Sequence, residues 1–183
     1  MNHLILLVIT LLAQDSGKEI LWDEKIRPQW ADFRAKPIDK SPHAAATHYL
    51  INSYINYREG SNIEYEITCV FLRDKSWVKP KAKGNMDLLE HELLHFDIAE
   101  CRARSLRKAL NRRVSMSDAV EHLKFVQDSV RQEWREVQLL YDEETSHGVI
   151  DEEQDKWEVR IDSTLQALAA YSNTKLEVAP LDK

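Results

Sequence analysis

The sequence has few residues that interrupt regular structure. Only four glycines and five prolines occur among its 183 residues, so long loops and low-complexity linkers are not expected. With 43% hydrophobic and 31% charged residues, the composition is that of a soluble globular protein rather than a disordered one. The length suits one domain with its own hydrophobic core.

An excess of positive charge is also lacking. The formal net charge of −6 argues against a nucleic-acid partner, because phosphate binding needs a basic face. The basic residues that do gather in one stretch predict the solvated face of a helix. They are Arg102, Arg104, Arg107, Lys108, Arg112 and Arg113.

Long apolar runs are missing as well. The most apolar segment runs from Leu4 to Ala13, and its length of about ten residues is too short to span a bilayer as a helix. A polar stretch follows at Gln14, which favours a secretory signal peptide over residues 1–13, although a buried first strand or helix is an alternative. We therefore expect a single domain over residues 14–183, secreted or periplasmic in a bacterium, with no stable membrane span after cleavage.

Only two cysteines are present, Cys69 and Cys101. In an exported protein an even number of cysteines permits one disulfide. The alternative is a pair of small buried side chains in separate elements.

Period-two hydrophobic alternation predicts strands in the first half of the chain. Glu19–Trp22 is typical of a short strand, and longer strands are predicted from Ala44 to Tyr57 and from Ile63 to Phe71. The turn residues 58–62 between the longer strands indicate a β-hairpin.

Helical periodicity follows in the second half. Three helices are predicted: residues 87–110, a second helix that Ser115 or Ser117 can cap, and residues 150–168 beyond the interruption at Gly148. The polar tail from Ser172 is predicted to be frayed. Strands followed by helices predict an α+β fold, with an N-terminal antiparallel sheet packed against about three long C-terminal helices.

One motif carries a specific chemistry. The segment from His91 to His95 reads HELLH and fits the H-E-x-x-H pattern of a zincin-like helix. Residues four apart share one helix face, so both imidazoles can reach one zinc ion. Glu92 projects about 100° round the helix, where it can take a proton from a zinc-activated water without being a ligand. The alternative is two exposed histidines on an amphipathic helix.

A catalytic zinc needs a third protein ligand and an open position. His147 is the favoured ligand, because Gly148 permits a tight turn that would direct the imidazole inward. On a continuous helix Glu100 projects about 140° away from His95 and is disfavoured. The remaining candidates are His122, His48, His43 or an acidic residue, and His147 has the alternative of a histidine favoured by the helix dipole.

Neighbouring residues are candidates for roles that support the zinc site. Asp97 and Glu100 can orient a zinc-bound histidine or pair with a basic residue. Tyr141 can donate a hydrogen bond to the oxyanion of the transition state, with a buried core tyrosine as the alternative. Trp77 and Trp157 are expected in the core.

Several of these stretches resemble the bacterial domain-of-unknown-function family 922. They are Ser76–Val78, Leu88–Glu100, Tyr141–Gly148 with Gln154 and Trp157, and also Trp30–Phe33 and Ala44–Thr47. The resemblance spans about residues 20 to 170. Its members are described as predicted secreted zinc-dependent proteases, so it implies export, a zinc site at His91 and His95, and a functional segment around His147. Leu93 and Leu94 depart from the Gln-Gly common in that family, but neither is a ligand.

The sequence therefore predicts an exported zinc metallopeptidase acting on a peptide or protein substrate, with Glu92 as general base. Two alternatives stay open: a zinc-stabilised binding or scaffold protein of the cell envelope without turnover, and a hydrolase of a non-peptide amide. Neither a cleavage preference nor an oligomeric state follows from these residues.

Overall fold

A computed structural model describes residues 17–57 and 61–181. The predicted signal peptide, residues 1–13, and most of the predicted turn at 58–62 lie outside them. The described elements, in chain order, are β1 (Glu19–Leu21), η1 (Trp30–Asp32), β2 (Ala45–Ala46), β3 (Tyr49–Asn56), β4 (Ile63–Leu72), β5 (Trp77–Val78), η2 (Pro80–Ala82), α1 (Met86–Leu110), α2 (Ala119–Glu144), α3 (Asp151–Ala167), η3 (Ala169–Tyr171) and β6 (Lys175–Val178).

Strand β4 is the centre of a four-stranded antiparallel sheet. It pairs with β3 along one edge, with Tyr49 opposite Phe71, which confirms the predicted hairpin pairing. β1 and β6 share its other edge. The alternation in β4 buries one row of side chains, namely Ile63, Tyr65, Ile67, Cys69 and Phe71.

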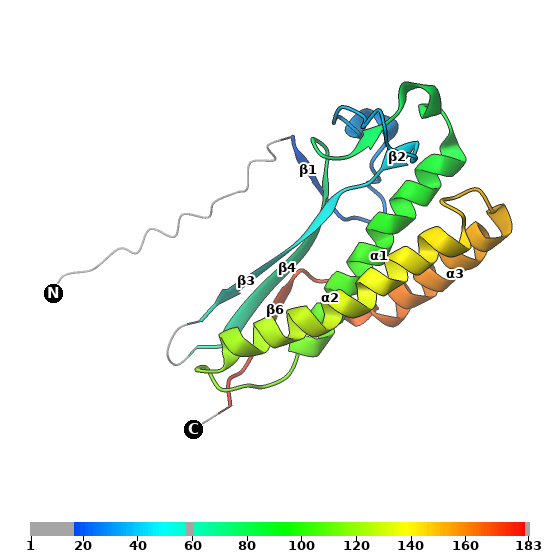
Figure 1. The fold of residues 1–183 in the computed structure, drawn as a ribbon. Helices are drawn as coiled ribbons and strands as arrows, with labels where there is room; N and C mark the ends of the chain where they lie inside the picture. The colour runs from blue at the N-terminus through cyan, green and yellow to red at the C-terminus, as the bar shows by residue number, and fades with distance from the viewer. Residues whose placement is uncertain (1–16, 58–60, 182–183) are drawn as a thin grey trace.

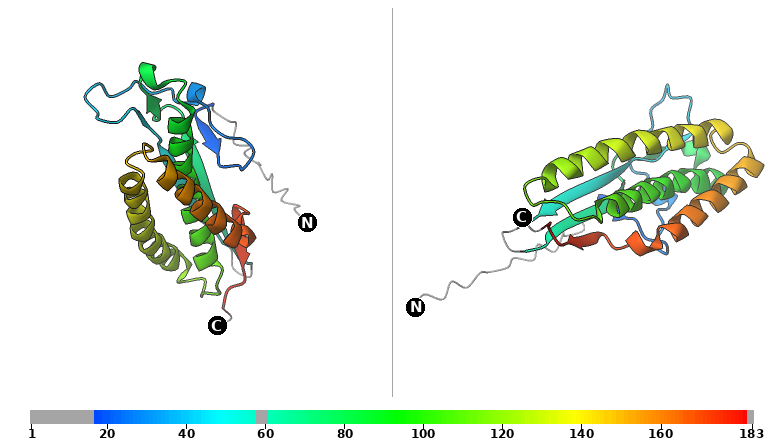
Figure 2. Two further views of the ribbon diagram at one scale, coloured as in Figure 1. Left: turned by 90° about the vertical axis from the view of Figure 1, so that its right-hand side faces the viewer. Right: turned by 90° about the horizontal axis from the view of Figure 1, so that it is seen from below.

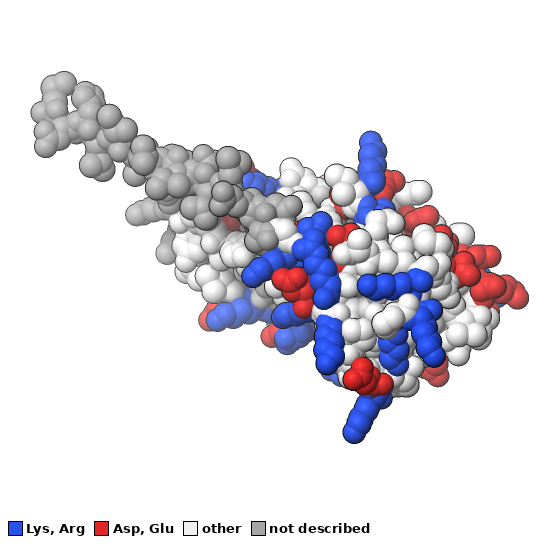
Figure 3. All heavy atoms as spheres, turned by 90° about the horizontal axis from the view of Figure 1, so that it is seen from above, with Lys and Arg blue, Asp and Glu red and all other residues white. Residues whose placement is uncertain are grey.

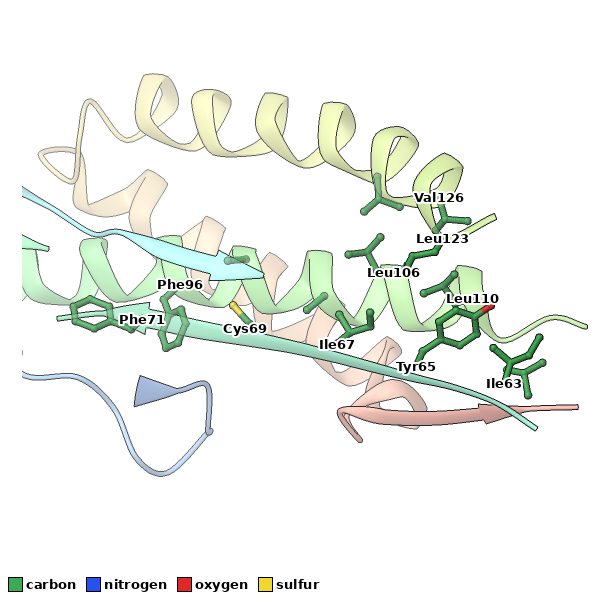
Figure 4. Close-up of a cluster of buried hydrophobic side chains, with 14 of the residues drawn as sticks. Ile63, Tyr65, Ile67, Cys69, Phe71, Phe96, Leu106, Leu110, Leu123 and Val126 are labelled. Carbon is green, nitrogen blue, oxygen red and sulfur yellow. The ribbon is translucent and has the colours of Figure 1, made fainter. Parts of the chain in front are cut away.

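The central helix is α1, which contacts β4, α2 and α3. Figures 1 and 2 show α2 and α3 flanking α1 along its length. Leu106 and Leu110 of α1 meet Leu123 and Val126 of α2 over the buried face of β4 (Figure 4). An antiparallel sheet packed on three helices confirms the α+β prediction. Across residues 17–57 and 61–181, every helix is too short or too polar to cross a membrane.

Two predicted boundaries in the strand regions are wrong. The segment from Ala44 to Tyr57 is two strands, interrupted at Thr47 and His48, where the His48 N–H donates to Ser76 Oγ at 2.9 Å. β2 therefore pairs with β5 in a separate two-stranded sheet, while β3 joins β4. The tail beyond Ser172 is not frayed throughout, since β6 pairs with β4 and buries Val178.

The prediction of a solvated basic face also fails in part, because Arg104 and Arg107 are only 7% and 1% exposed. Glu100 accepts hydrogen bonds from Arg104 Nε at 3.1 Å and Arg107 Nη1 at 2.8 Å, and Arg107 also donates to the Ile67 carbonyl. Buried charges need such partners, so the Glu100 carboxylate is engaged inside the fold.

Both cysteines are free and buried, on different elements. Burial raises the pKa of the Cys101 thiol to about 12. The pair therefore matches the alternative of small buried side chains, and the disulfide is not formed. Trp77 and Trp157 lie in the interior, as predicted.

Candidate metal centre

The H-E-x-x-H segment lies in the first half of α1. Asn85 caps this helix by accepting a hydrogen bond from the Leu88 N–H at 3.1 Å. Without glycine or proline the helix runs unbroken to Leu110, so His91, Glu92 and His95 keep helical spacing. All three line one pocket of about 520 Å³, whose walls also include β2 and the end of α2.

Asp142 on α2 faces the two imidazoles. Its Oδ1 lies 3.4 Å from His91 Nε2 and 3.1 Å from His95 Nε2, and the three ligand atoms all lie within 4.8 Å of one another. Roughly 3.3 Å separates neighbouring ligands around a tetrahedral ion with bonds of about 2.0–2.1 Å. These three residues could therefore hold a metal ion.

The charge of the group suits a cation. Burial alone would raise the pKa of Asp142, but hydrogen bonds from His91 and His95 hold it well below its usual range. Burial alone would likewise lower the pKa of His95, and the Asp142 carboxylate outweighs it, so that the pKa of His95 is raised. The ionised carboxylate thus stabilises positive charge at this position.

Two glutamines contact the far side of the imidazole rings. Gln154 Oε1 lies 3.3 Å from His91 Nδ1, and Gln138 Oε1 forms a short hydrogen bond with His95 Nδ1. An acceptor at Nδ1 keeps a proton there, so the Nε2 proton that faces Asp142 is the one that a metal ion would replace. This arrangement fits a pair of metal-binding histidines. The Gln138 role was missed, although its four-residue spacing from Asp142 places both on one face of α2.

Glu92 lies in the pocket wall and is only 5% exposed. Its Oε2 is buried and has no hydrogen-bond partner within the described part of the chain. A buried carboxylate oxygen without a partner is costly, and in native proteins it is explained by local strain, by a catalytic role or by a bound water or ion. Glu92 is not one of the three grouped ligands.

His147, the predicted third ligand, lies at the pocket rim and is 54% exposed. Its Nδ1 is 3.1 Å from Asp142 Oδ1, and its ring meets that of His43 at 4.7 Å. The three-residue ligand group contains Asp142 in its place, so His147 contacts the site through that carboxylate. Positive φ angles at Ser146, His147 and Gly148 make the tight turn expected at this point.

The other candidate residues have different surroundings. Among the described residues that line the pocket, His43 is present, whereas His48 and His122 are not. Asp97 pairs with Arg27 at 2.6 Å and accepts a hydrogen bond from an indole N–H, which matches the predicted pairing with a basic residue.

Tyr141 is fully buried behind the site. Its hydroxyl donates to Gln154 Oε1 at 2.7 Å and lies 3.2 Å from the His91 carbonyl oxygen. Its ring stacks on that of His91 with centroids 4.7 Å apart. These contacts match the alternative of a core tyrosine, and they position His91.

No protein-family model, curated protein or solved structure matches the chain. The resemblance to family 922 therefore stays a prediction from the residues quoted above.

We expect Gly148→Ala to destabilise the fold and distort the site. A methyl group there would lie 2.7 Å from His91 Cγ and 2.8 Å from His91 Cβ, and the residue has φ +77. Overpacking and backbone strain together predict a loss of about 2–4 kcal/mol in the free energy of unfolding, measured by chemical denaturation.

Gly17→Ala is the matched control, because Gly17 has a similar φ of +65 with nothing within 4 Å among the described atoms. Its free energy of unfolding should fall by only about 1 kcal/mol, which is the cost of backbone strain without a steric contact. Equal losses in both variants would show that the contact with His91 is relieved without cost.

Proposed function

We propose that this chain is an exported zinc-dependent metallopeptidase in which Glu92 is the general base. The observation that carries the proposal is the unpartnered Oε2 of Glu92, buried beside two histidines and one aspartate in a shared pocket. Three protein ligands leave one position open on a tetrahedral zinc, which is typical of catalytic sites. A structural site would use four ligands and would have no need of Glu92.

The roles of the chain's own residues follow from their contacts. His91, His95 and Asp142 would hold the ion, with Gln154 and Gln138 keeping the imidazoles in the ligating tautomer. When bound, zinc supplies Lewis acidity toward a carbonyl and a bound water.

Glu92 handles the proton. Its Oε2, which lacks an internal partner, accepts a proton from the attacking water and passes it to the leaving amine.

The pocket suits a polypeptide segment. Its volume falls within the range typical of ligand sites, and its walls combine apolar residues with the candidate catalytic group. The apolar part includes Ala44, Ala45, Leu88 and Val149. A non-peptide amide would undergo the same chemistry, so cleavage products decide between the two substrate classes.

The test is metal analysis of the purified chain together with digestion of a diverse peptide library. We expect one zinc per chain, and cleavage that falls at least about 100-fold with a chelator and returns with added zinc. Stoichiometric zinc without cleavage of any peptide would favour the scaffold alternative. A chain that retains no metal would overturn the proposal.

A further inference from the structure

The surface beside the pocket has a strong positive charge in an otherwise acidic protein. Residues 33–43 and 72–85 contain eight basic and two acidic residues, although the whole chain has a net charge of −6. Backbone hydrogen bonds from Arg34 to Arg73 and from Ala35 to Ser76 hold the two segments side by side. We call this surface the basic cap. Figure 3 shows Lys and Arg side chains gathered over this end of the molecule.

Most cations of the basic cap have no counterion among the residues that the structure describes. Five of its lysines are exposed and form no ion pair with any residue in 17–57 or 61–181, namely Lys36, Lys40, Lys75, Lys81 and Lys83. Arg73, by contrast, pairs with Asp32 at 3.0 Å. Clustered like charges repel one another, so an anionic partner would relieve a cost that the fold itself leaves in place.

Apolar side chains are exposed among these lysines. Ile38, between Lys36 and Lys40, is 59% exposed, and Met86, three residues after Lys83, is 52% exposed. Basic residues interleaved with exposed apolar ones are typical of surfaces that lie in the headgroup layer of a membrane. The lysines alone would suit an acidic polypeptide, whereas lysines together with exposed apolar side chains suit a headgroup layer.

The chain enters the described fold at the same surface. The Gly17 carbonyl accepts hydrogen bonds from Arg34 Nη1 and Arg73 Nη1. These contacts hold the start of the described fold against the basic cap.

The opposite charge lies on another side of the pocket. Residues 142–155, around the connection between α2 and α3, contain seven acidic residues and no lysine or arginine. An anionic surface repels this region and attracts the basic cap, so the charge distribution favours one orientation. We propose that the basic cap docks on an anionic phospholipid bilayer, with Ile38 and Met86 entering the headgroup layer.

The test compares binding of the full chain to phosphatidylcholine vesicles with and without phosphatidylglycerol, by co-sedimentation. The gain in binding that phosphatidylglycerol causes measures the charge-dependent affinity, because any uncharged contribution is common to both kinds of vesicle. Changing four lysines of the cap to glutamate should lower the charge-dependent affinity for vesicles at least about 100-fold, since each lysine near an anionic surface raises that affinity several-fold. The substitutions are Lys36→Glu, Lys40→Glu, Lys81→Glu and Lys83→Glu.

A control variant with the same net charge carries Lys108→Glu, Lys124→Glu, Arg135→Glu and Lys175→Glu, all at exposed positions outside the cap. Its charge-dependent affinity for vesicles should fall by less than about fivefold, because charges far from the bilayer are screened. Ile38→Ser should lower vesicle binding about five- to tenfold with the charge unchanged. If the variant with four substitutions does not fold, the single variants Ile38→Ser and Lys40→Glu still test the proposal.

An equal loss of vesicle affinity in the two variants with four substitutions would overturn the proposal, because net charge alone would then explain binding. Tight, salt-sensitive binding to polyglutamate without vesicle binding would also overturn it and indicate an acidic polypeptide as the partner. Both outcomes are independent of peptidase activity, which is measured without vesicles.

Discussion

Replacing Glu92 with glutamine is expected to lower kcat/KM for peptide cleavage by about 10²–10⁴-fold, while zinc content stays unchanged. Glutamine keeps the shape of the side chain but offers no basic oxygen to take the proton of the attacking water. Zinc should remain, because Glu92 lies outside the ligand group of His91, His95 and Asp142. Steady-state kinetics on the best library peptide and metal analysis of the same sample measure the two effects.

Glu90→Gln is the matched control for this experiment. Glu90 lies on the same helix, two residues away, and its side chain is exposed. The control should keep wild-type rate and zinc content. Undiminished cleavage by Glu92→Gln would rule out the general base role, and loss of zinc from that variant would make Glu92 a ligand.

The second large effect is expected at Asp142. Asp142→Ala should weaken zinc binding by more than about 100-fold, because partners that merely orient ligands already account for 10–100-fold. His147→Ala should weaken it by about tenfold, since His147 contacts Asp142 Oδ1 at 3.1 Å and holds that carboxylate in place. Competition against a zinc-binding dye measures both affinities.

These two variants decide which residue is the third ligand. The sequence favours His147, whereas the structure groups Asp142 with the two histidines. A larger loss in His147→Ala than in Asp142→Ala would restore His147 as the third ligand. Glu143→Ala serves as the control, because Glu143 is the exposed neighbour of Asp142 on α2 and lines no part of the described pocket. It should bind zinc as tightly as the wild type.

Local patterns predicted the elements that have strong periodicity. The alternation from Ile63 to Phe71 predicted β4, and the absence of glycine and proline predicted α1. β6 was missed because its short, polar sequence becomes a strand only by pairing with β4. The division of residues 44–57 depends on a hydrogen bond to Ser76, which no local pattern reveals.

The buried arginines show the same limit. Arg107 reads as a surface cation in a charged helix, yet it is enclosed by Glu100 and by the carbonyls of Ile67 and Tyr171. Helical spacing shows which residues share a face, but it does not show what that face meets. Glu100 lies on α1 itself, whereas the two carbonyls come only from the packing of β4 and η3 against α1.

The sequence by itself determined that His91, Glu92 and His95 share one side of a continuous helix, because four-residue spacing on α1 is a local property. The tertiary structure decided what meets them. Packing of α2 and α3 on α1 brings Asp142, Gln138 and Gln154 to the imidazoles from positions more than forty residues away. Contacts of this kind depend on how helices pack, which short-range periodicity does not encode.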